Sequence, residues 1–493
     1  MRSSRFFLPA LGALALAGCS ADRPEPLAPF AAPGSSSHSV SESAPGRYIL
    51  ASNGGFSKDL AARVAALGGT LESVHAGAGI AVVSGISDAA AAQLPAISGV
   101  NDVEADEVIS LDAPIAVAEA DASATQDPSL YNQANPTLAS RYSWQWNMQD
   151  IGAPKAWAKG KLGSSSVTVA ILDTGIDYDA PDLSGLVDLS RSTSFIPGDD
   201  AITHTYFPSR NVISDYHGHG TNVATQVSSN ARALAGVTSH TTLIGVKVLS
   251  GQGSGPLSAI LNGVLYAADQ GADVANMSLG GSFAKAGNGR FVGLINQVFN
   301  YAKQKGMLIV VAAGNDGVDL DHNGNTFVSY CDAPHVMCVS SVGPQQATQM
   351  TSIPDTLDIP AFYSNFGRSG ISVAAPGGNA RPDLAPSAWP WGSDIASWVW
   401  SYCSKTRLVF NASGAILGYA GCQAGNRLTG YIGTSQATPH VAGLAALLVV
   451  EKGHGKPQII KNSIQNSADD LGQPGTDPFY GRGRINVAKA LGL

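Results

Sequence analysis

The chain has 493 residues, of which 44% are hydrophobic and 13% are charged. This length and composition allow a large buried core and more than one folded unit, and they exclude a chain that is disordered throughout. The formal net charge of -8 provides no basic field that could hold phosphate groups. We therefore expect no nucleic acid among the partners.

The first 19 residues have the parts of an export signal: a basic start, Met1–Arg5, and an apolar run, Phe6–Leu16, too short to span a bilayer. The following Leu16-Ala17-Gly18-Cys19 resembles the bacterial lipoprotein signal, in which the cysteine is lipidated and becomes the new N-terminus. We expect residues 1–19 to be such a signal, with Cys19 as the lipid site. The alternative is an ordinary cleaved signal with an incidental cysteine.

Residues 20–45 are rich in Pro, Ala and Ser and are predicted to form a flexible linker. The pattern then changes, and residues 46–112 are predicted to form a small α+β domain. Ser87 is expected to cap its second helix. The predicted elements are strands over Tyr48–Leu50 and Ile80–Val83, helices over Leu60–Leu67 and Ser87–Leu94, and closing strand material over Val100–Leu111.

Residues 113–142, rich in Ala, Ser, Asp and Gln, are predicted to be a second linker, and residues 143–493 a large α/β domain. Continuous apolar strands that alternate with helices indicate a buried parallel sheet with helices on both faces. The predicted strands are Val167–Leu172, Leu243–Leu249, Val274–Met277 and Met307–Ala312, and the predicted helices include Pro256–Gln270 and Leu294–Lys305.

Three segments of this domain place reactive side chains where an α/β fold builds active sites. Asp173 ends the first apolar strand, within Leu172-Asp173-Thr174-Gly175. His219, in His217-Gly218-His219-Gly220-Thr221, opens a helix of small residues. Ser435 lies in Gly433-Thr434-Ser435-Gln436-Ala437-Thr438-Pro439, before a helix rich in Ala. Alone, an Asp that ends a strand is commonly structural.

Together these segments resemble the signature blocks of the subtilisin family of serine proteases (subtilases, family S8), in the order Asp, His, Ser. The resemblance covers about Trp144 to Leu491. It implies a subtilisin-like fold and a catalytic triad of Asp173, His219 and Ser435. In such a triad the imidazole takes the proton of the serine hydroxyl, and the carboxylate holds the imidazole in the required tautomer. His217 is a rival base, but the family pattern places the base directly before Gly-Thr, which is His219.

Further segments gain a role from the same resemblance. Ala312-Ala313-Gly314-Asn315 is similar to the block in which this family presents an asparagine to the oxyanion, so Asn315 and the Ser435 amide would form the oxyanion hole. Gly253-Ser254-Gly255 and Ser278-Leu279-Gly280 resemble the edges that bind an extended peptide by backbone pairing. The domain at 46–112 resembles the family's inhibitory propeptide, which would be removed by cleavage in the 113–142 linker. The alternative is an unrelated α+β module.

The five cysteines are Cys19, Cys331, Cys338, Cys403 and Cys422. With Cys19 set aside, four remain in an exported chain, and disulfides are expected. Four cysteines allow three connectivities, and proximity in sequence favours Cys331 with Cys338 and Cys403 with Cys422. Buried free thiols are the alternative.

Three features stand apart from the family pattern. Asn222 and Gln436 occupy positions where the family often has a second histidine and a methionine. Asp319–Asn325 has the alternating oxygen ligands of a calcium loop, but Tyr330 stands where a bidentate Glu is required. A structural calcium and a plain solvated turn both remain open there, and we assign no metal site.

The third feature is a Trp-rich insertion at 378–432, which includes a predicted hairpin around Asn411–Gly414. Its indoles either pack together or shape access to the substrate. The sequence as a whole predicts a monomeric serine endopeptidase that needs no cofactor for its chemistry and takes proteins or peptides as substrates. We expect it to be made as a zymogen inhibited by its own propeptide, exported as a lipid-anchored precursor at the cell envelope or secreted after processing. A catalytically silent peptide-binding protein and a small-molecule esterase or amidase are the alternatives.

Overall fold

A computed structural model describes most of the chain. The predicted signal, with Cys19, and nearly all of the first linker lie outside the described residues. In the part that is described, no helix is long and apolar enough to cross a membrane. The described residues are 43–111, 117–121, 131–284, 289–344, 356–380, 395–411, 413–420 and 427–493.

The N-terminal unit is an α+β fold whose antiparallel strands are ordered β2-β3-β1-β4, the ferredoxin-like arrangement. Ser87 accepts a hydrogen bond from the Ala90 amide, as predicted for a helix cap. The second helix ends earlier than predicted, because Pro95 has no N–H to continue it and a 3-10 turn, η1 (Leu94–Ala96), takes over. The elements are β1 (Ser43–Ala51), α1 (Leu60–Ala66), β2 (Thr70–His75), β3 (Ile80–Ser84), α2 (Asp88–Ala91) and β4 (Asp102–Ser110).

A seven-stranded sheet, ordered β15-β14-β12-β10-β6-β8-β7, forms the centre of the larger unit. Every neighbouring pair runs parallel, which confirms the predicted parallel sheet. The four predicted strands correspond to β6, β8, β10 and β12, and β7, β14 and β15 extend the sheet beyond them. The strands are β6 (Thr168–Asp173), β7 (Thr193–Ser194), β8 (Thr242–Lys247), β10 (Val274–Met277), β12 (Leu308–Ala312), β14 (Val336–Val342) and β15 (Val373–Pro376).

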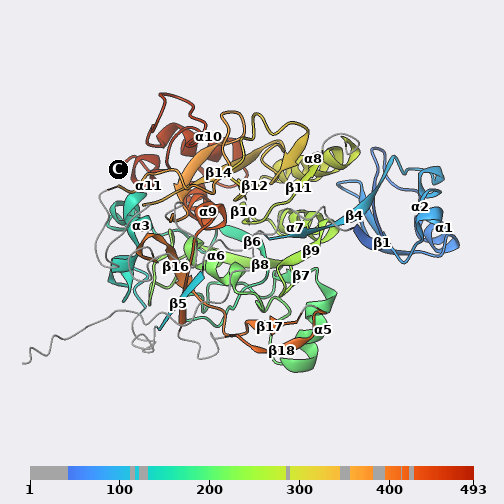
Figure 1. Ribbon diagram of the computed structural model, residues 1–493, viewed down its shortest axis with the longest axis horizontal. Coiled ribbons are helices and arrows are strands. Elements are labelled where there is room, and N and C mark those ends of the chain that lie inside the picture. The colour runs from blue at the N-terminus through green and yellow to red at the C-terminus, as the bar shows by residue number, and fades with distance from the viewer. Residues whose placement is uncertain are drawn as a thin grey trace, which may run out of the picture.

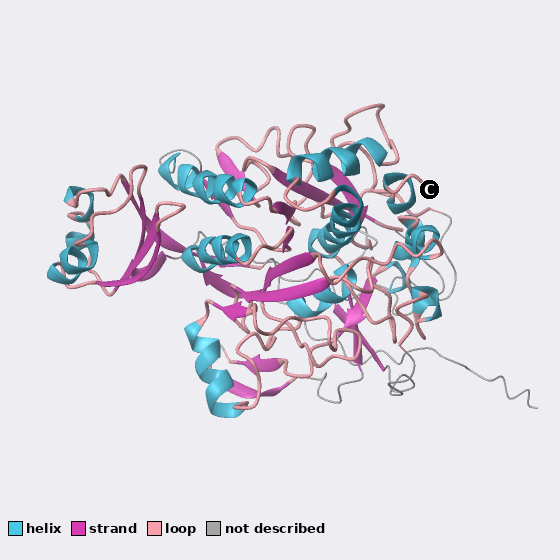
Figure 2. Cartoon of the chain, turned by 180° about the vertical axis from the view of Figure 1, so that it is seen from behind, coloured by secondary structure: helices cyan, strands magenta, loops and turns pink. Residues whose placement is uncertain are grey.

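The sheet lies between two hydrophobic cores, as the side chains of β6 show. Val169 and Ile171 belong to the core that contains α6 (His219–Val227) and α9 (Thr434–Lys452). The alternate residues Ala170 and Leu172 belong to the core that contains α7 (Leu257–Asp269) and α8 (Gly289–Gln304). Helices therefore cover both faces (Figure 2), and α6 and α9 position the candidate site.

Shorter elements complete the larger unit. Two match predictions in part: α7 agrees to within one residue at each end, whereas α8 begins at Gly289 and so before the predicted Leu294. The remaining helices are η4 (Pro136–Leu138), η5 (Tyr142–Trp144), α3 (Trp146–Asp150), α4 (Ala153–Trp157), α5 (Pro197–Tyr206), α10 (Pro457–Ser467) and α11 (Val487–Ala490). The remaining strands here are β9 (Ser254–Pro256), β11 (Ser282–Ala284) and β13 (Thr326–Val328).

The insertion and the second linker both contain strands. β17 (Leu408–Phe410) and β18 (Ile416–Tyr419) form an antiparallel hairpin, which confirms the predicted turn around Asn411–Gly414. A separate antiparallel sheet is ordered β16-β19-β5. Its strands are β16 (Val399–Tyr402), β19 (Arg427–Tyr431) and β5 (Val117–Asp121), and the 3-10 turn η7 (Ile395–Ser397) precedes it.

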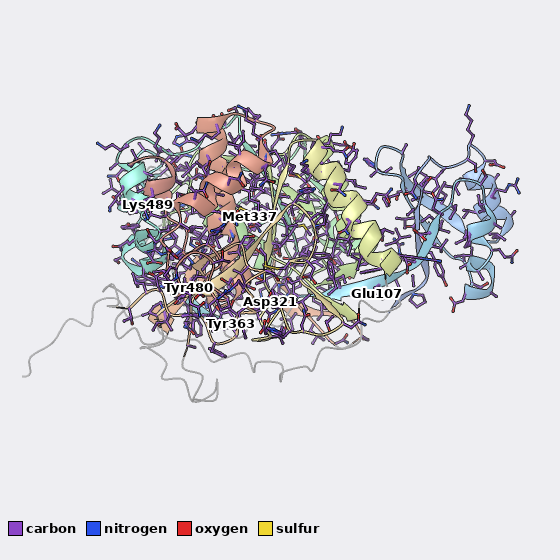
Figure 3. All side chains as sticks on the ribbon, turned by 90° about the horizontal axis from the view of Figure 1, so that it is seen from above. Glu107, Asp321, Met337, Tyr363, Tyr480 and Lys489 are labelled. Atoms are coloured by element: carbon purple, nitrogen blue, oxygen red, sulfur yellow. A yellow bond between two sulfur atoms is a disulfide. The ribbon has the colours of Figure 1, made fainter. Side chains whose placement is uncertain are left out.

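The N-terminal unit rests on the larger unit through its sheet. Ile49, Ile80 and Ile109 pack into the core that contains α7 and α8, while the helices of the small unit cover a core of their own. In Figure 1, β4 extends from the small unit toward α7 and β9, and Glu107 lies where β4 reaches the larger unit (Figure 3). The chain of the small unit therefore reaches the surface that holds the candidate site.

Candidate active site

Asp173 and His219 form a buried pair at the carboxyl edge of the sheet. The Asp173 Oδ1 atom lies 2.8 Å from the His219 Nδ1 atom and also accepts the Thr174 amide at 2.7 Å. Asp173 is fully buried and His219 is 6% exposed. A carboxylate held on Nδ1 fixes the imidazole so that Nε2 can take up a proton.

A second carboxylate, Asp215, holds the start of α6 in place. Its oxygens accept the amides of Gly218 and Thr221 and the hydroxyls of Thr174 and Thr221, at distances between 2.6 and 2.9 Å. Burial alone would raise the pKa of Asp215, but the hydrogen bonds from Thr221 and Gly218 outweigh it and lower the pKa below its ordinary value. Sequence reasoning missed this residue, whose only signal was its place four residues before His219.

Glycines allow α6 to approach the strand that carries Asp173. Gly218 precedes His219 with a φ of 100°, a conformation that favours glycine. A Cβ atom on Gly220 would lie 2.1 Å from the Gly175 carbonyl oxygen. Any side chain there would force the helix away from β6 and separate His219 from Asp173.

His217, the rival base, lies in a different environment. Its ring centroid is 6.3 Å from that of His219, and its Nδ1 atom is buried with no hydrogen-bond partner among the described residues. Burial, with the nearby His219, lowers the pKa of His217 to about 3. Such a weak base is unsuited to accept the proton of a hydroxyl group at neutral pH.

Ser435 lies in the first turn of α9 and is half-buried. Its Oγ donates to the Ser278 carbonyl oxygen at 3.2 Å, and the Ser278 Oγ donates to the Ser435 carbonyl oxygen at 2.8 Å. Ser278 directly follows β10, the neighbour of β6 in the sheet. These reciprocal bonds hold Ser435 against the edge of the sheet at which Asp173 ends its strand.

Asn315 follows β12, the next strand along the same edge. Its Oδ1 accepts the Thr434 amide at 2.8 Å and the Thr434 hydroxyl at 3.0 Å. The same hydroxyl accepts the Gly314 amide at 3.1 Å. These bonds fix the orientation of the Asn315 side-chain amide beside Thr434. Its oxygen is used as an acceptor, so Nδ2 is the atom that can donate a hydrogen bond.

The two residues that depart from the family pattern contact each other. The Gln436 Nε2 atom donates to the Asn222 Oδ1 atom at 3.3 Å, and both side chains are buried. Asn222 lies on α6, as His219 does, and Gln436 follows Ser435 on α9. The contact therefore joins the helix that carries the histidine to the helix that carries the serine.

The segment predicted to bind substrate by backbone pairing is occupied by the chain's own N-terminal unit. β4 pairs antiparallel with β9, with Val108 opposite Pro256, Ile109 opposite Gly255 and Ser110 opposite Ser254. The next residue, Leu111, donates its amide to the Gly253 carbonyl oxygen at 2.8 Å. The edge at Gly253-Ser254-Gly255 can thus hold an extended polypeptide.

The second predicted edge also lies close to β4. A Cβ atom on Gly281 would lie 3.1 Å from the Ile109 side chain, and Ile109 itself is 2% exposed. Leu279 is buried, and a Cβ atom on Gly280 would lie 2.4 Å from the Ser329 Oγ atom. Gly281 thus leaves room for the strand that carries Ile109, whereas Gly280 leaves room for Ser329.

The structure contains a disulfide between Cys331 and Cys338, at the start of β14. Cys403 is also disulfide-bonded, and Cys422, its predicted partner, lies outside the described residues. Cys403 follows β16, and the Cys331–Cys338 bond joins the segment after β13 to β14.

Carboxylates of the candidate calcium loop are hydrogen-bonded within the loop and to a distant segment. Asp319 pairs with His322 at 2.7 Å, and Asp321 accepts the amides of Arg368 and Ser369. Tyr330 is fully buried. No group of three or more His, Cys, Asp or Glu side chains that could hold a metal ion occurs among the described residues.

The described part of the Trp-rich insertion is packed. Trp398 and Trp400 are each 1% exposed, Trp400 contacts Trp144 edge to face, and the Trp146 indole donates to the Trp398 carbonyl oxygen. Trp389 and Trp391 lie outside the described residues. Both indoles that the structure describes are therefore packed in the hydrophobic core.

Comparisons with known proteins agree with this geometry. A sequence model of the subtilase family matches residues 164–483. Thermitase from Thermoactinomyces vulgaris is 32% identical over 73% of this chain and 99% of its own length. The thermophilic serine proteinase of Bacillus sp. (strain AK1) is 32% identical over 73% of this chain and 71% of its own.

Among solved structures, the epidermin leader peptide processing serine protease from Staphylococcus aureus shares the fold, with a TM-score of 0.66 and 21% identity. The likeness covers 90% of this chain and 97% of that protein. The parallel sheet with helices on both faces is thus the subtilisin-like fold. By sequence, fold and family match, the chain belongs to the subtilase family of serine endopeptidases.

Proposed function

We propose that the chain hydrolyses peptide bonds of proteins through Asp173, His219 and Ser435, with Asn315 in the oxyanion hole. The observation that carries this proposal is the buried contact of 2.8 Å between Asp173 and His219 at the edge of the sheet. The contact between Asn222 and Gln436 then joins α6, which carries His219, to α9, which carries Ser435.

In the first step, the Ser435 Oγ attacks the scissile carbonyl carbon while the His219 Nε2 takes the hydroxyl proton. The oxyanion that forms is stabilised by the Asn315 Nδ2 and the Ser435 amide. His219 then returns the proton to the leaving amine, and an acyl group remains on Ser435. A water molecule, activated by the same imidazole, hydrolyses this ester and regenerates the hydroxyl.

The test compares the chain without its signal with Ser435→Ala, His219→Ala and His217→Ala variants. We expect casein hydrolysis by the parent and by His217→Ala, and a loss of activity in the other two to the level of background. The His217→Ala variant is the matched control, because His217 is the nearest other imidazole. Full activity of a folded Ser435→Ala variant would overturn the proposal.

We further propose that residues 46–112 are an inhibitory propeptide, so that the chain is a zymogen that cuts itself in the 113–142 linker. The pairing of β4 with β9 supports this role, because it fills an edge that a substrate would need. Asp106, which is fully buried, also accepts the Ser258 amide in the first turn of α7 at 2.9 Å. A carboxylate at a helix N-terminus is a favourable contact.

Export and lipid attachment at Cys19 complete the proposal. If Cys19 carries lipid and the propeptide is removed, the anchor leaves with the propeptide and the mature protease is released. Labelling with radioactive palmitate, with a Cys19→Ser variant as control, tests this directly. We expect the label on the N-terminal fragment after processing, and label on the catalytic fragment would contradict the release.

A further inference from the structure

The short strand β5 lies on the edge of the strand that leads into the nucleophile. β5 pairs antiparallel with β19 over five positions, from Val117 opposite Tyr431 to Asp121 opposite Arg427. Because β19 is the middle strand of the order β16-β19-β5, its β5-facing edge is open to another strand whenever β5 leaves. Tyr431 is followed, after three residues, by Ser435.

The sheet that β5 joins is attached to both catalytic helices. Trp400 on β16 accepts a hydrogen bond from the Gln226 side chain at 2.8 Å, and Ser401 on β16 donates to the Asn222 carbonyl oxygen at 2.8 Å. Asn222 and Gln226 belong to α6, which begins at His219. At its other end β19 runs directly toward α9. This edge is thus fixed relative to both His219 and Ser435.

The chain lies on two edges in succession. It follows β9 from Val108 opposite Pro256 to Ser110 opposite Ser254, and it then follows β19 from Val117 to Asp121. Because the proposed cut lies in the 113–142 linker, residues 108–110 on β9 precede the scissile bond, and β5 follows it when the cut falls before Val117. The second edge therefore lies where the part that follows the scissile bond would go.

We propose that β19, supported by β16 of the insertion, binds the leaving-group side of polypeptide substrates as an added antiparallel strand, and that β5 occupies it first. The proposal rests on the proposed function, and it gives the insertion a part in substrate binding. Main-chain pairing of this kind favours extended chains over folded ones. It also implies that substrates with several residues beyond the scissile bond are preferred.

The same edge selects for a small side chain at one position. Ala120 lies opposite Leu428, which in turn lies opposite Tyr402. All three side chains are at most 1% exposed and belong to the same hydrophobic core. A bulky residue at the position of Ala120 has no room without displacing that core. Substrates should therefore carry Ala, Ser or Gly there.

The test uses the full-length chain with Ala120→Trp, and Ala120→Ser as the matched control. We expect the first-order rate of self-cleavage, followed by fragment mass, to fall at least about tenfold in Ala120→Trp and to stay near the parent rate in Ala120→Ser. Thermal unfolding of the Ala120→Trp and Ala120→Ser variants, each in a Ser435→Ala background, shows whether each chain folds. Equal rates in two folded chains would overturn the proposal.

A second measurement does not depend on how Ala120→Trp folds. Processed enzyme is given quenched peptides with the chain's own sequence, residues 104–121 and residues 104–116, and a p-nitroanilide peptide with no residue beyond the scissile bond. We expect kcat/KM to be at least about tenfold higher for the peptide of residues 104–121 than for the peptide of residues 104–116. Equal values, or a cut within residues 117–121 of the longer peptide, would contradict β19 as the leaving-side edge. Failure to cleave even the p-nitroanilide would count against the proposed function instead.

Discussion

Replacing Asp215 by Asn should both destabilise the fold and slow catalysis. Asp215 is fully buried, and its Oδ2 accepts the Thr221 amide at 2.9 Å and the Thr221 hydroxyl at 2.6 Å. Its Oδ1 accepts the Thr174 hydroxyl and the amides of His217 and Gly218 at 2.8 to 3.0 Å. In Asp215→Asn, one oxygen becomes an NH₂ group that faces a backbone N–H.

The size of the effect follows from these bonds. A hydrogen bond to a charged group contributes about 1.5 to 3 kcal/mol, and a buried donor left without an acceptor adds a cost of similar size. The Thr221 hydroxyl can rotate and accept from the new amide, so we count mainly the lost Thr221 amide bond and the lost charge. The free energy of unfolding should fall by about 3 kcal/mol.

Catalysis should fall because these bonds hold the first turn of α6, which carries His219. A small shift of a catalytic group lowers the rate by about a hundredfold. Stability is measured by urea unfolding in a Ser435→Ala background, and kcat/KM with casein in the active chain. Asp179→Asn is the matched control, because the Asp179 side chain is 48% exposed. A loss below about 0.5 kcal/mol, with kcat/KM unchanged, would refute this account of Asp215.

Four further predictions follow from single contacts. Asn315→Ala should lower kcat by about 100- to 1,000-fold, the size known for subtilisin, with little change in KM. Steady-state kinetics measure both constants, and an unchanged kcat would contradict the prediction. Asp106→Ala should weaken binding of the cleaved propeptide about tenfold or more and shorten the lag before casein hydrolysis, whereas Asp88→Ala, far from α7, should leave the lag unchanged. Gln436→Met should make the enzyme lose activity faster in dilute peroxide than the parent, because a thioether beside Ser435 is oxidised; rapid loss in the parent would contradict this. Burial, only partly offset by Arg484, raises the pKa of Asp150 from 3.8 to about 7, so the folded chain keeps a proton that the unfolded chain has lost. The Asp150 carboxyl should therefore make stability fall as pH rises from about 4 to 7, by up to about 4 kcal/mol, and in Asp150→Asn the fall should be smaller by a similar amount when unfolding is measured at both pH values in the Ser435→Ala background.

Much of the sheet could be predicted because its central strands are continuous apolar runs. β6, β8, β10 and β12 are buried on both faces and are therefore mostly apolar, which the sequence shows directly. β14 was harder, since Val336–Val342 includes a cysteine and two serines whose burial depends on partners elsewhere. The Ser341 hydroxyl, for example, forms a hydrogen bond of 2.8 Å with the Tyr363 hydroxyl. No local sequence pattern indicates that these two residues meet.

β5 could not have been predicted, because Val117–Asp121 has the alanine-rich composition of a linker. Its strand conformation comes from the edge of β19, a partner about three hundred residues later in the chain. Asp215 was missed for a similar reason. Its role depends on two threonines, Thr174 and Thr221, which the fold brings to it from β6 and α6.

The sequence predicted those residues of the candidate site that lie in short motifs at or after the ends of strands. Asp173 is the last residue of β6 and Asn315 follows β12 by three residues, so their shared edge could be predicted from the parallel sheet. The contact between Asn222 and Gln436 was not readable. Each residue was noted only as a departure from the family pattern, and only the packing of α6 against α9 brings the two together.

The most direct test of the central claim is to label the processed enzyme with a fluorophosphonate and identify the modified residue by mass spectrometry. Such a reagent reacts with a serine only where a neighbouring base activates it. We expect one adduct, on Ser435, that is lost in His219→Ala and retained in His217→Ala. An adduct on another serine, or undiminished labelling of Ser435 in His219→Ala, would contradict the triad.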